Sequence, residues 1–313
     1  MVALSSLRDR VVDEVGKLVI GKESETELLL ISLLARGHTL IEGVPGVSKT
    51  LLARSFSECM GLRFRRVQFT PDMLPLDIVG GFVFNMKDRE FEFRKGPVFT
   101  NILLADEINR SPPKVQSALL ESMQERQVTI EGHTESLPSP HMVIATQNSV
   151  EFQGVYPLPE AQLDRFMLSI RMGYPSEIEE AAIIKRNMTE MDLQVIQKVV
   201  SSEELDRAFQ EVMAVKVSDE LVDYMARFAA ETRRDERIEL GASPRALVHL
   251  THAARAKAYV TGRNYVIPDD IKGLAVHVIP HRLKLKQRSV LLEGTFTTKG
   301  VTQQIIDGVK PPR

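Results

Sequence analysis

One eight-residue loop limits what this chain can fold into more than any other feature. It reads GVPGVSKT and lies between a short apolar run and a helical pattern that opens at Leu51. A strand, a glycine-rich loop and a helix in this order are typical of a phosphate-binding loop, because backbone N–H groups and the helix N-terminus attract phosphate oxygens. Lys49 would reach the outer phosphates, and the hydroxyl of Thr50 would hold Mg²⁺. The residues expected at this site are Gly43, Val44, Pro45, Gly46, Val47, Ser48, Lys49, Thr50 and Leu51.

Ser48 is the one departure from the full pattern G-x-x-x-x-G-K-[ST], because it stands where the second glycine belongs. Serine keeps the residue small but gives up part of the backbone freedom that glycine provides. The loop alone therefore leaves a second interpretation open, an ordinary Gly/Pro turn ahead of a helix.

The composition bounds the class of protein. The 313 residues are long enough for two domains, and 40 Lys and Arg against 42 Asp and Glu leave no overall charge that favours nucleic acid or a membrane. The sequence shows no apolar run of spanning length and no secretory leader in its first ten residues. The single cysteine, Cys59, excludes an internal disulfide and reads as a small buried hydrophobe. We therefore expect a cytoplasmic protein without membrane insertion.

Buried-strand patterns alternate with helical patterns up to about residue 175, which predicts an α/β fold with a parallel sheet. The expected strands are 38–42, 64–69, 101–105, 142–145 and 166–172, with hairpins at about 82–93 and 127–137. Helical segments are expected afterwards at 176–190, 202–212, 219–232, 244–260 and 269–278. The candidate helix caps are Ser176, Ser202, Ser218 and Asp269. This division predicts a nucleotide-binding core over 1–175 and a small all-helical lid over 176–313.

Polar side chains follow two of the expected buried strands. Asp106 and Glu107 end the run ILLADE, and Asn148 follows the next buried strand. The carboxyl edge of a parallel sheet is where ligands of α/β proteins bind. Asp106 could therefore help to hold Mg²⁺, Glu107 could act as general base for a water, and Asn148 could orient that water. The competing interpretations are a strand capped by solvated acids and a turn asparagine.

Two arginines lie at positions from which they could contact a phosphoryl group. Arg165 precedes the last expected strand, and Arg245 opens a helix of the lid. A guanidinium group can spread a permanent charge over a phosphoryl group in transit, although a surface salt bridge is the commoner fate of an arginine.

The ordered phrases GVPGVSKT, LLADEINRSPPKVQSALLESMQE, IATQN, PLPEAQLDRF and GASPRA resemble the MoxR branch of the AAA+ ATPases, over about residues 19–282. By this resemblance the loop 43–50 is the Walker A motif, and Asp106 with Glu107 is the Walker B pair. Asn148 corresponds to sensor 1, Arg245 to sensor 2 and Arg165 to the arginine finger. The resemblance also places Val19, Ile20, Gly21 and Lys22 at the adenine pocket.

The resemblance implies ATP and Mg²⁺ as cofactors and ATP hydrolysis as the reaction. An arginine finger on the opposite rim of its own subunit would serve a neighbour, which implies a homo-oligomeric ring, expected to be a hexamer. The lid would move as Arg245 gains or loses the γ-phosphate, and the two hairpins would contact a client near the pore. The implied role is chaperone-like maturation of protein complexes, with a von Willebrand factor A domain protein as one possible partner.

Three alternatives are kept open by particular residues. Ser48 favours a nucleotide-dependent binding platform with little turnover. The basic cluster 283–288 would suit a nucleic-acid-associated AAA+ motor, although such a run is usually a solvated tail or helix end. A small-molecule kinase is disfavoured by the helical lid. The histidine pairs 249/252 and 277/281 are interpreted as partly buried lid histidines rather than metal ligands.

Overall fold

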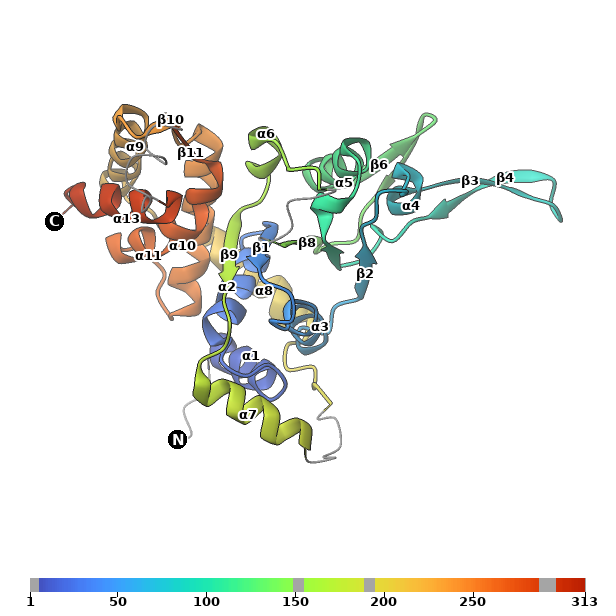
Figure 1. The fold of residues 1–313 in the computed structure, drawn as a ribbon, viewed down its shortest axis with the longest axis horizontal. Helices are drawn as coiled ribbons and strands as arrows, with labels where there is room; N and C mark the ends of the chain where they lie inside the picture. Colours follow the sequence, from blue (N-terminus) through green and yellow to red (C-terminus); the bar gives the residue numbers. More distant parts are fainter. Residues whose placement is uncertain (1–5, 149–154, 189–194, 287–296, 313) are drawn as a thin grey trace.

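The computed structural model describes residues 6–148, 155–188, 195–286 and 297–312 (Figure 1). Its centre is a five-stranded parallel sheet in the order β2-β5-β8-β1-β9. The strands are β1 (Thr39–Gly43), β2 (Phe64–Gln68), β5 (Ile102–Asp106), β8 (Met142–Asn148) and β9 (Leu168–Met172). The predicted parallel α/β fold is therefore confirmed. The glycine-rich loop follows β1, which lies between β8 and β9 in the sheet.

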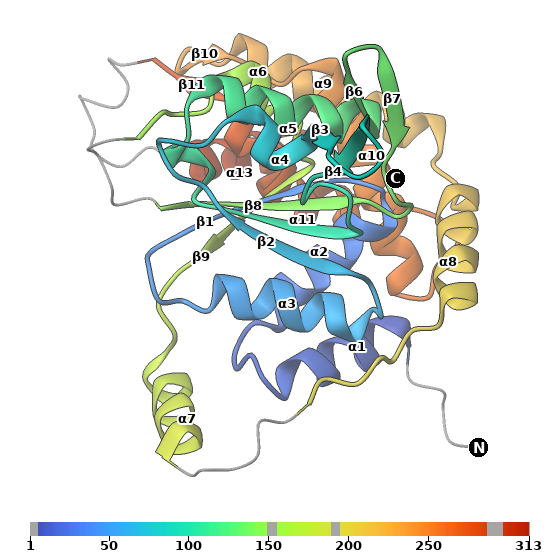
Figure 2. The same cartoon turned by 90° about the vertical axis from the view of Figure 1, so that its right-hand side faces the viewer.

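Helices cover both faces of this sheet, and Figure 2 shows α1 and α3 below it and α4 and α5 above it. These covering helices are α1 (Leu7–Gly16), α2 (Glu23–Leu34), α3 (Lys49–Cys59), α4 (Pro75–Val79) and α5 (Pro113–Glu125). Successive strand residues point to opposite faces, so Ile41 joins the apolar cluster that contains Phe56 of α3, and Leu40 joins the cluster of Leu119 of α5. Cys59 is buried among the first cluster, as predicted.

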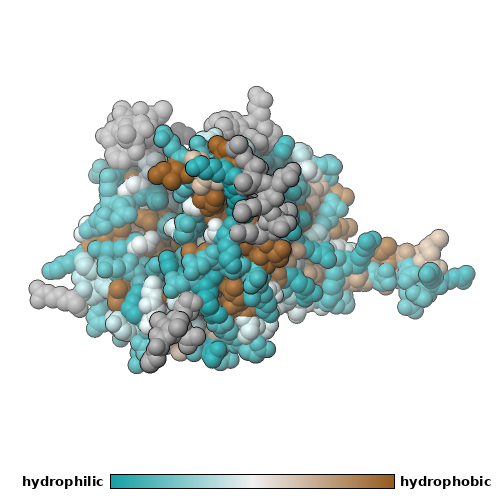
Figure 3. All heavy atoms as spheres, turned by 90° about the horizontal axis from the view of Figure 1, so that it is seen from below, coloured by the Kyte–Doolittle hydropathy of each residue, from teal (hydrophilic) through white to brown (hydrophobic). Residues whose placement is uncertain are grey.

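Both predicted hairpins are present. Their strands are β3 (Gly80–Asn85) with β4 (Glu90–Lys95), and β6 (Gln127–Ile130) with β7 (His133–Ser136). The β3–β4 hairpin projects from the body as an arm, which carries both hydrophobic and hydrophilic residues (Figures 1 and 3). Phe84, Met86 and Phe91 are exposed on it, Met86 to 82%. Exposed apolar side chains on a projecting arm are typical of a contact surface.

The five helices predicted after residue 175 are also present, although the predicted end of the first, at 189–190, lies outside the described residues. The longer helices are α7 (Glu177–Met188), α8 (Ser202–Ala214), α9 (Asp219–Arg234), α10 (Pro244–Val260), α11 (Pro268–Val278) and α13 (Thr298–Gly308). The shorter elements are α6 (Glu160–Leu163), η1 (Ile108–Arg110), η2 (Pro280–Arg282), β10 (Ile238–Leu240) and β11 (Lys284–Leu285). Among the described helices, none combines the length and apolar character needed to cross a membrane.

Two predicted helix caps were wrong. Ser201, not Ser202, caps α8, because its hydroxyl accepts the N–H of Glu204 at 3.1 Å. At α11 the carboxylate of Asp270 accepts the N–H of Ile267 at 3.0 Å, so Asp269 is not the cap.

The basic cluster was also misread. Residues 284–285 form strand β11, which pairs antiparallel with β10, rather than a solvated tail or helix end. The last two residues of that cluster, 287–288, lie outside the described residues. Helix α13 and the β10–β11 pair were not predicted.

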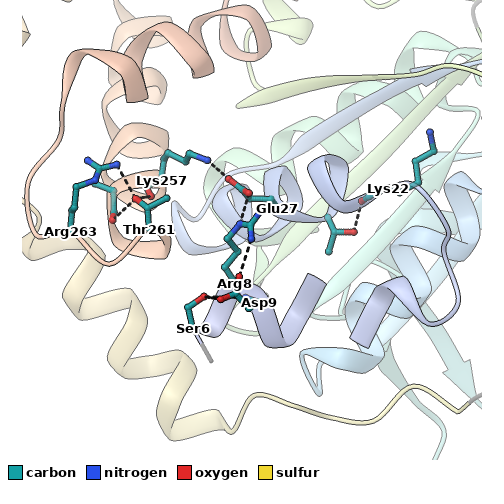
Figure 4. A network of polar contacts seen from close by, with 10 residues as sticks. Ser6, Arg8, Asp9, Lys22, Glu27, Lys257, Thr261 and Arg263 are labelled. Atoms are coloured by element: carbon teal, nitrogen blue, oxygen red, sulfur yellow. Dashed lines mark hydrogen bonds and ion pairs between the residues drawn. The ribbon is translucent and has the colours of Figure 1, made fainter. Parts of the chain in front are cut away.

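A polar network ties the helical part of the chain to the sheet part (Figure 4). Glu27 of α2 accepts a hydrogen bond from Arg8 of α1 at 2.5 Å and another from Lys257 of α10. Burial alone would raise the pKa of Glu27, but the hydrogen bonds from Lys257 and Arg8 outweigh it and lower the pKa below its usual range. One carboxylate therefore joins three helices from both ends of the chain.

Candidate nucleotide site

The glycine-rich loop has the backbone shape that its motif requires. It joins the end of β1 to the start of α3, and Gly46 and Ser48 have φ values of 84° and 62°. Ser48 thus adopts the left-handed conformation that glycine would take, at a cost of about 1–2 kcal/mol for a residue with a Cβ. The expected loss of backbone freedom at Ser48 has not changed the path of the loop.

Lys49 connects this loop to the neighbouring strand. Its buried Nζ donates to the carbonyl oxygen of Gly43 and to Oδ1 of Asn148, both at 2.9 Å. These contacts hold the ammonium group at the carboxyl edge of the sheet, between β1 and β8, where an outer phosphate would meet it.

Asp106 lies at the same edge, at the end of β5. Its Oδ1 accepts the hydroxyl of Thr146 at 2.6 Å, and its Oδ2 accepts Nε of Arg66 at 2.9 Å and the hydroxyl of Thr50 at 3.3 Å. A carboxylate and a hydroxyl this close offer the hard oxygen donors that Mg²⁺ prefers, so the residues present fit that ion.

Glu107 is held by three side chains. Its φ of 57° turns it away from the line of β5, and Oε1 accepts Nδ2 of Asn148 at 2.8 Å. Its Oε2 accepts Nε2 of Gln68 at 2.6 Å and Nη1 of Arg110 at 2.9 Å. Asn148 therefore bridges Glu107 and Lys49, which puts a carboxylate, an amide and an ammonium group in one hydrogen-bonded chain.

A cavity of about 570 Å³ opens beside the loop. Gly46, Val47, Ser48 and Leu51 line one side of it. Its other walls come from the turn after α1, from α3 and from the segment around α7, through Leu18, Val19, Ile20, Lys22, Arg54, Ser55, Glu58, Pro175, Ile183, Arg186, Val195 and Ile196. The volume and the largely apolar walls suit a small ligand such as a nucleoside.

The four residues expected at the adenine pocket are not all placed alike. Val19, Ile20 and Lys22 line the cavity, whereas Gly21 is not among its lining residues. Gly21 has a φ of 70°, and a side chain there would overlap the carboxylate of Glu179 on α7. The glycine therefore lets α7 pack closely over the turn.

Arg165 and Arg245 lie at the amino ends of the strands, opposite to the carboxyl ends that carry the loop 43–50. Both line a second cavity, of about 410 Å³, together with His38 just before β1 and Met167 just before β9. Gly43 ends β1 at the other edge, and a five-residue strand spans about 15 Å. Arg245 therefore does not lie at the phosphate loop of its own chain.

Of the lid histidines, His249 and His252 line this second cavity, whereas His277 and His281 line a different one. His249 accepts Nη2 of Arg282 through Nδ1 at 2.5 Å, and burial, with the charge of Arg282 next, lowers the pKa of His249 to about 3. His281 lies beside the carbonyl oxygen of Phe166 at 3.0 Å. These side chains are partly buried, as predicted.

Comparison with known proteins fixes the family. Residues 38–168 match the model of the ATPase family associated with various cellular activities (AAA), and residues 230–304 match the AAA lid domain. The chain is 47% identical over 287 residues to the chaperone MoxR1 of Mycobacterium tuberculosis, covering 88% of this chain and 75% of that protein. This chain belongs to the MoxR family of AAA+ ATPases.

Two further comparisons cover almost the whole MoxR chain. The Bacillus subtilis protein YeaC is 43% identical over 309 residues, which is 99% of this chain and 96% of YeaC. A crystal structure of a candidate ATPase from Cytophaga hutchinsonii superimposes with a TM-score of 0.89 at 41% identity. That match covers 98% of this MoxR chain and 96% of the other.

Sequence reasoning missed four residues of the MoxR site. Thr146 supports Asp106, and it also accepts the backbone N–H of Glu107 at 2.9 Å. The other three donate to the two carboxylates and are Arg66, Gln68 and Arg110. Arg66 and Gln68 lie near the carboxyl end of β2, beside β5, so knowledge of the strand order would have pointed to them.

Proposed function

We propose that this MoxR protein hydrolyses ATP to ADP and phosphate. The observation that carries the proposal is the hydrogen-bonded chain from Lys49 through Asn148 to Glu107, at 2.9 and 2.8 Å, at the mouth of the phosphate loop. This chain joins the group that would hold the outer phosphates to the group that would activate water. The adjoining cavity of about 570 Å³ gives the nucleoside a place.

Each residue has a defined part in this reaction. Backbone N–H groups of the loop, the N-terminus of α3 and Lys49 bind the phosphates. Thr50 and Asp106 would hold Mg²⁺, which neutralises charge on the phosphate oxygens. Glu107 accepts a proton from the attacking water. At the same time the oxygen of that water bonds to the γ-phosphorus, and the bond from the γ-phosphorus to ADP breaks. Asn148 orients that water.

We also propose that the reaction is completed between subunits. Arg165 and Arg245 lie about 15 Å, one strand length, from the edge that carries the phosphate loop. They can reach the γ-phosphate of a neighbour when copies assemble head to tail, and such a contact closes into a ring, here a hexamer. The core at 1–175 and the lid at 176–313 would shift against each other as the neighbour's phosphate is lost.

The biological role that we propose is chaperone-like remodelling of protein complexes in the cytoplasm. The relative MoxR1 is named a chaperone. The projecting β3–β4 arm, with Phe84, Met86 and Phe91 exposed, offers a surface for a protein client. A von Willebrand factor A domain protein is one partner to test.

A nucleotide-dependent binding platform is the second candidate, because three donors already occupy the oxygens of Glu107. Steady-state phosphate release separates the two functions. We expect Glu107→Gln to bind ATP normally but to lower kcat about 100-fold or more, since it removes the general base. Wild-type turnover as low as that of Glu107→Gln, with intact ATP binding, would favour the platform.

A further inference from the structure

The second cavity carries an unusual concentration of positive charge, and we call it the cationic hollow. Four arginines line it, contributed by the end of α2, the end of α5, the turn before β9 and the start of α10: Arg36, Arg126, Arg165 and Arg245. Three histidines, His38, His249 and His252, also line it. Among the described residues that line the hollow there is no aspartate or glutamate.

The contacts of these arginines leave their charges largely uncompensated. Arg165 donates to the carbonyl oxygen of Leu120 at 2.7 Å, and Arg36 lies over the ring of Phe209 at 4.7 Å. Arg245 lies 3.8 Å from Asp164, but the same carboxylate is 3.0 Å from Arg282. The single carboxylate of Asp164 therefore lies near two guanidinium groups, while three further arginines line the same hollow.

Arg126, like Arg36, has no role in any of the predicted motifs. Its Nη2 donates to the carbonyl oxygen of Arg36 at 3.4 Å, and no ion pair of Arg126 is found among the described residues. Partial burial, and then the charge of Arg36, lower the pKa of Arg126. Two like charges thus face each other without an acid, an arrangement that a bound anion would relieve.

The backbone of Arg126 is fixed more firmly than that of an ordinary surface arginine. It ends α5 with a φ of 53°, and its N–H donates to the carbonyl oxygen of Ser122 at 2.9 Å. Its own carbonyl oxygen accepts the N–H of Leu137 at 3.0 Å, at the base of the β6–β7 hairpin. A force on the Arg126 side chain would therefore act directly on that hairpin.

We propose that Arg126 is a third phosphate-contacting arginine of the intersubunit site, beside Arg165 and Arg245, and that it binds the terminal phosphate of the nucleotide held by the neighbouring subunit. This inference rests on the proposed function. The ligand chemistry is a phosphoryl anion, because several convergent guanidinium groups match its charge and its oxygen geometry. Contact through Arg126 would report the state of the neighbour's nucleotide to the β6–β7 hairpin.

The first test compares R126Q and R126K with the matched control R234Q, which removes an exposed arginine of α9. The measurements are kcat, ring formation by mass photometry, and binding of a non-hydrolysable ATP analogue. We expect R126Q to lower kcat at least 10-fold in assembled rings and to leave analogue binding unchanged, with R126K recovering part of the loss. R234Q should behave as wild type. An unchanged kcat per assembled R126Q ring would overturn the proposal.

The second test asks which subunit Arg126 serves. K49A chains mixed with R126Q chains should recover hydrolysis, because some seams then pair an intact loop with an intact Arg126. K49A mixed with R165A is the reference. If the reference mixture recovers and R126Q hydrolyses normally, only the role of Arg126 fails. If the reference is silent in co-assembled chains, the intersubunit function itself fails.

A third arm separates the neighbour's nucleotide from a free anion. Inorganic phosphate and pyrophosphate are titrated by calorimetry into K49A chains, whose own loop is disabled, with and without R126Q. Phosphate binding that is lost in K49A/R126Q, together with normal hydrolysis by R126Q, would show a free-anion site and would contradict the proposal. Weakened hydrolysis with recovery in the mixed rings supports it.

Discussion

At the scale of single residues, three non-glycine residues near the two sites have the left-handed backbone conformation that side chains disfavour. Ser48, Glu107 and Arg126 all have φ near 55–60° without being glycine. Each lies where a strand, loop or helix must turn sharply toward the nucleotide site or the cationic hollow. Residues in such conformations are held by their surroundings, and they concentrate at functional sites. Ser48 thus keeps the loop shape without the glycine of the full motif.

Several buried and partly buried histidines make stability depend on pH, because burial lowers their pKa values. Burial lowers the pKa of His38 and of His249 to about 3, from an ordinary value of 6.5. The unfolded chain then binds more protons than the native state below pH 6.5, so stability is full above that pH and falls as the pH drops toward 3. The loss should be about 1.4 kcal/mol per pH unit for each histidine.

Urea unfolding at pH 7.5, 6.5 and 5.5 measures this effect. The free energy of unfolding should change little between the first two values and fall clearly by the third. His38→Gln should reduce that slope, because it removes one of the histidines whose pKa burial lowers. An equal slope in wild type and His38→Gln would show that His38 is not the responsible group.

At the scale of elements, the Glu27 network should hold the helical part to the sheet part. Glu27→Gln leaves Arg8 and Lys257 facing a neutral side chain, so we expect a loss of about 1–3 kcal/mol in the free energy of unfolding. Glu23→Gln, on the exposed start of α2, is the matched control and should lose less than about 1 kcal/mol. Urea denaturation gives both values, and equal losses would contradict a joining role for Glu27.

Elements with a clear local sequence pattern were predicted correctly. The five parallel strands, both hairpins and the five helices from α7 to α11 follow apolar periodicity or turn residues. Strands β10 and β11 contain three and two residues and lie more than forty residues apart, so no local period marks them. The acids and the loop lysine were predictable because they follow strands. Gln68 and Arg110 were not, since their roles depend on where their side chains meet Glu107.

At the scale of the whole molecule, the placement of Arg245 was the feature that no sequence pattern could give. It depends on how α10 packs against α2, which places Arg245 in the same cavity as Arg165. The phosphate loop and these arginines therefore lie at opposite edges of one chain. In the proposed mechanism each copy would supply half of a hydrolytic site at either end of its sheet, as a head-to-tail ring requires.

Mixing two inactive variants tests this central claim most directly. Lys49→Ala disables the phosphate loop and Arg165→Ala removes the arginine that would act on the neighbour, so each variant alone should release almost no phosphate. In mixed rings, seams that join the loop of the Arg165→Ala chain to the arginine of the Lys49→Ala chain are complete, and hydrolysis should return. If mass photometry and labelled chains show that the variants share rings and phosphate release stays at background, the account is wrong.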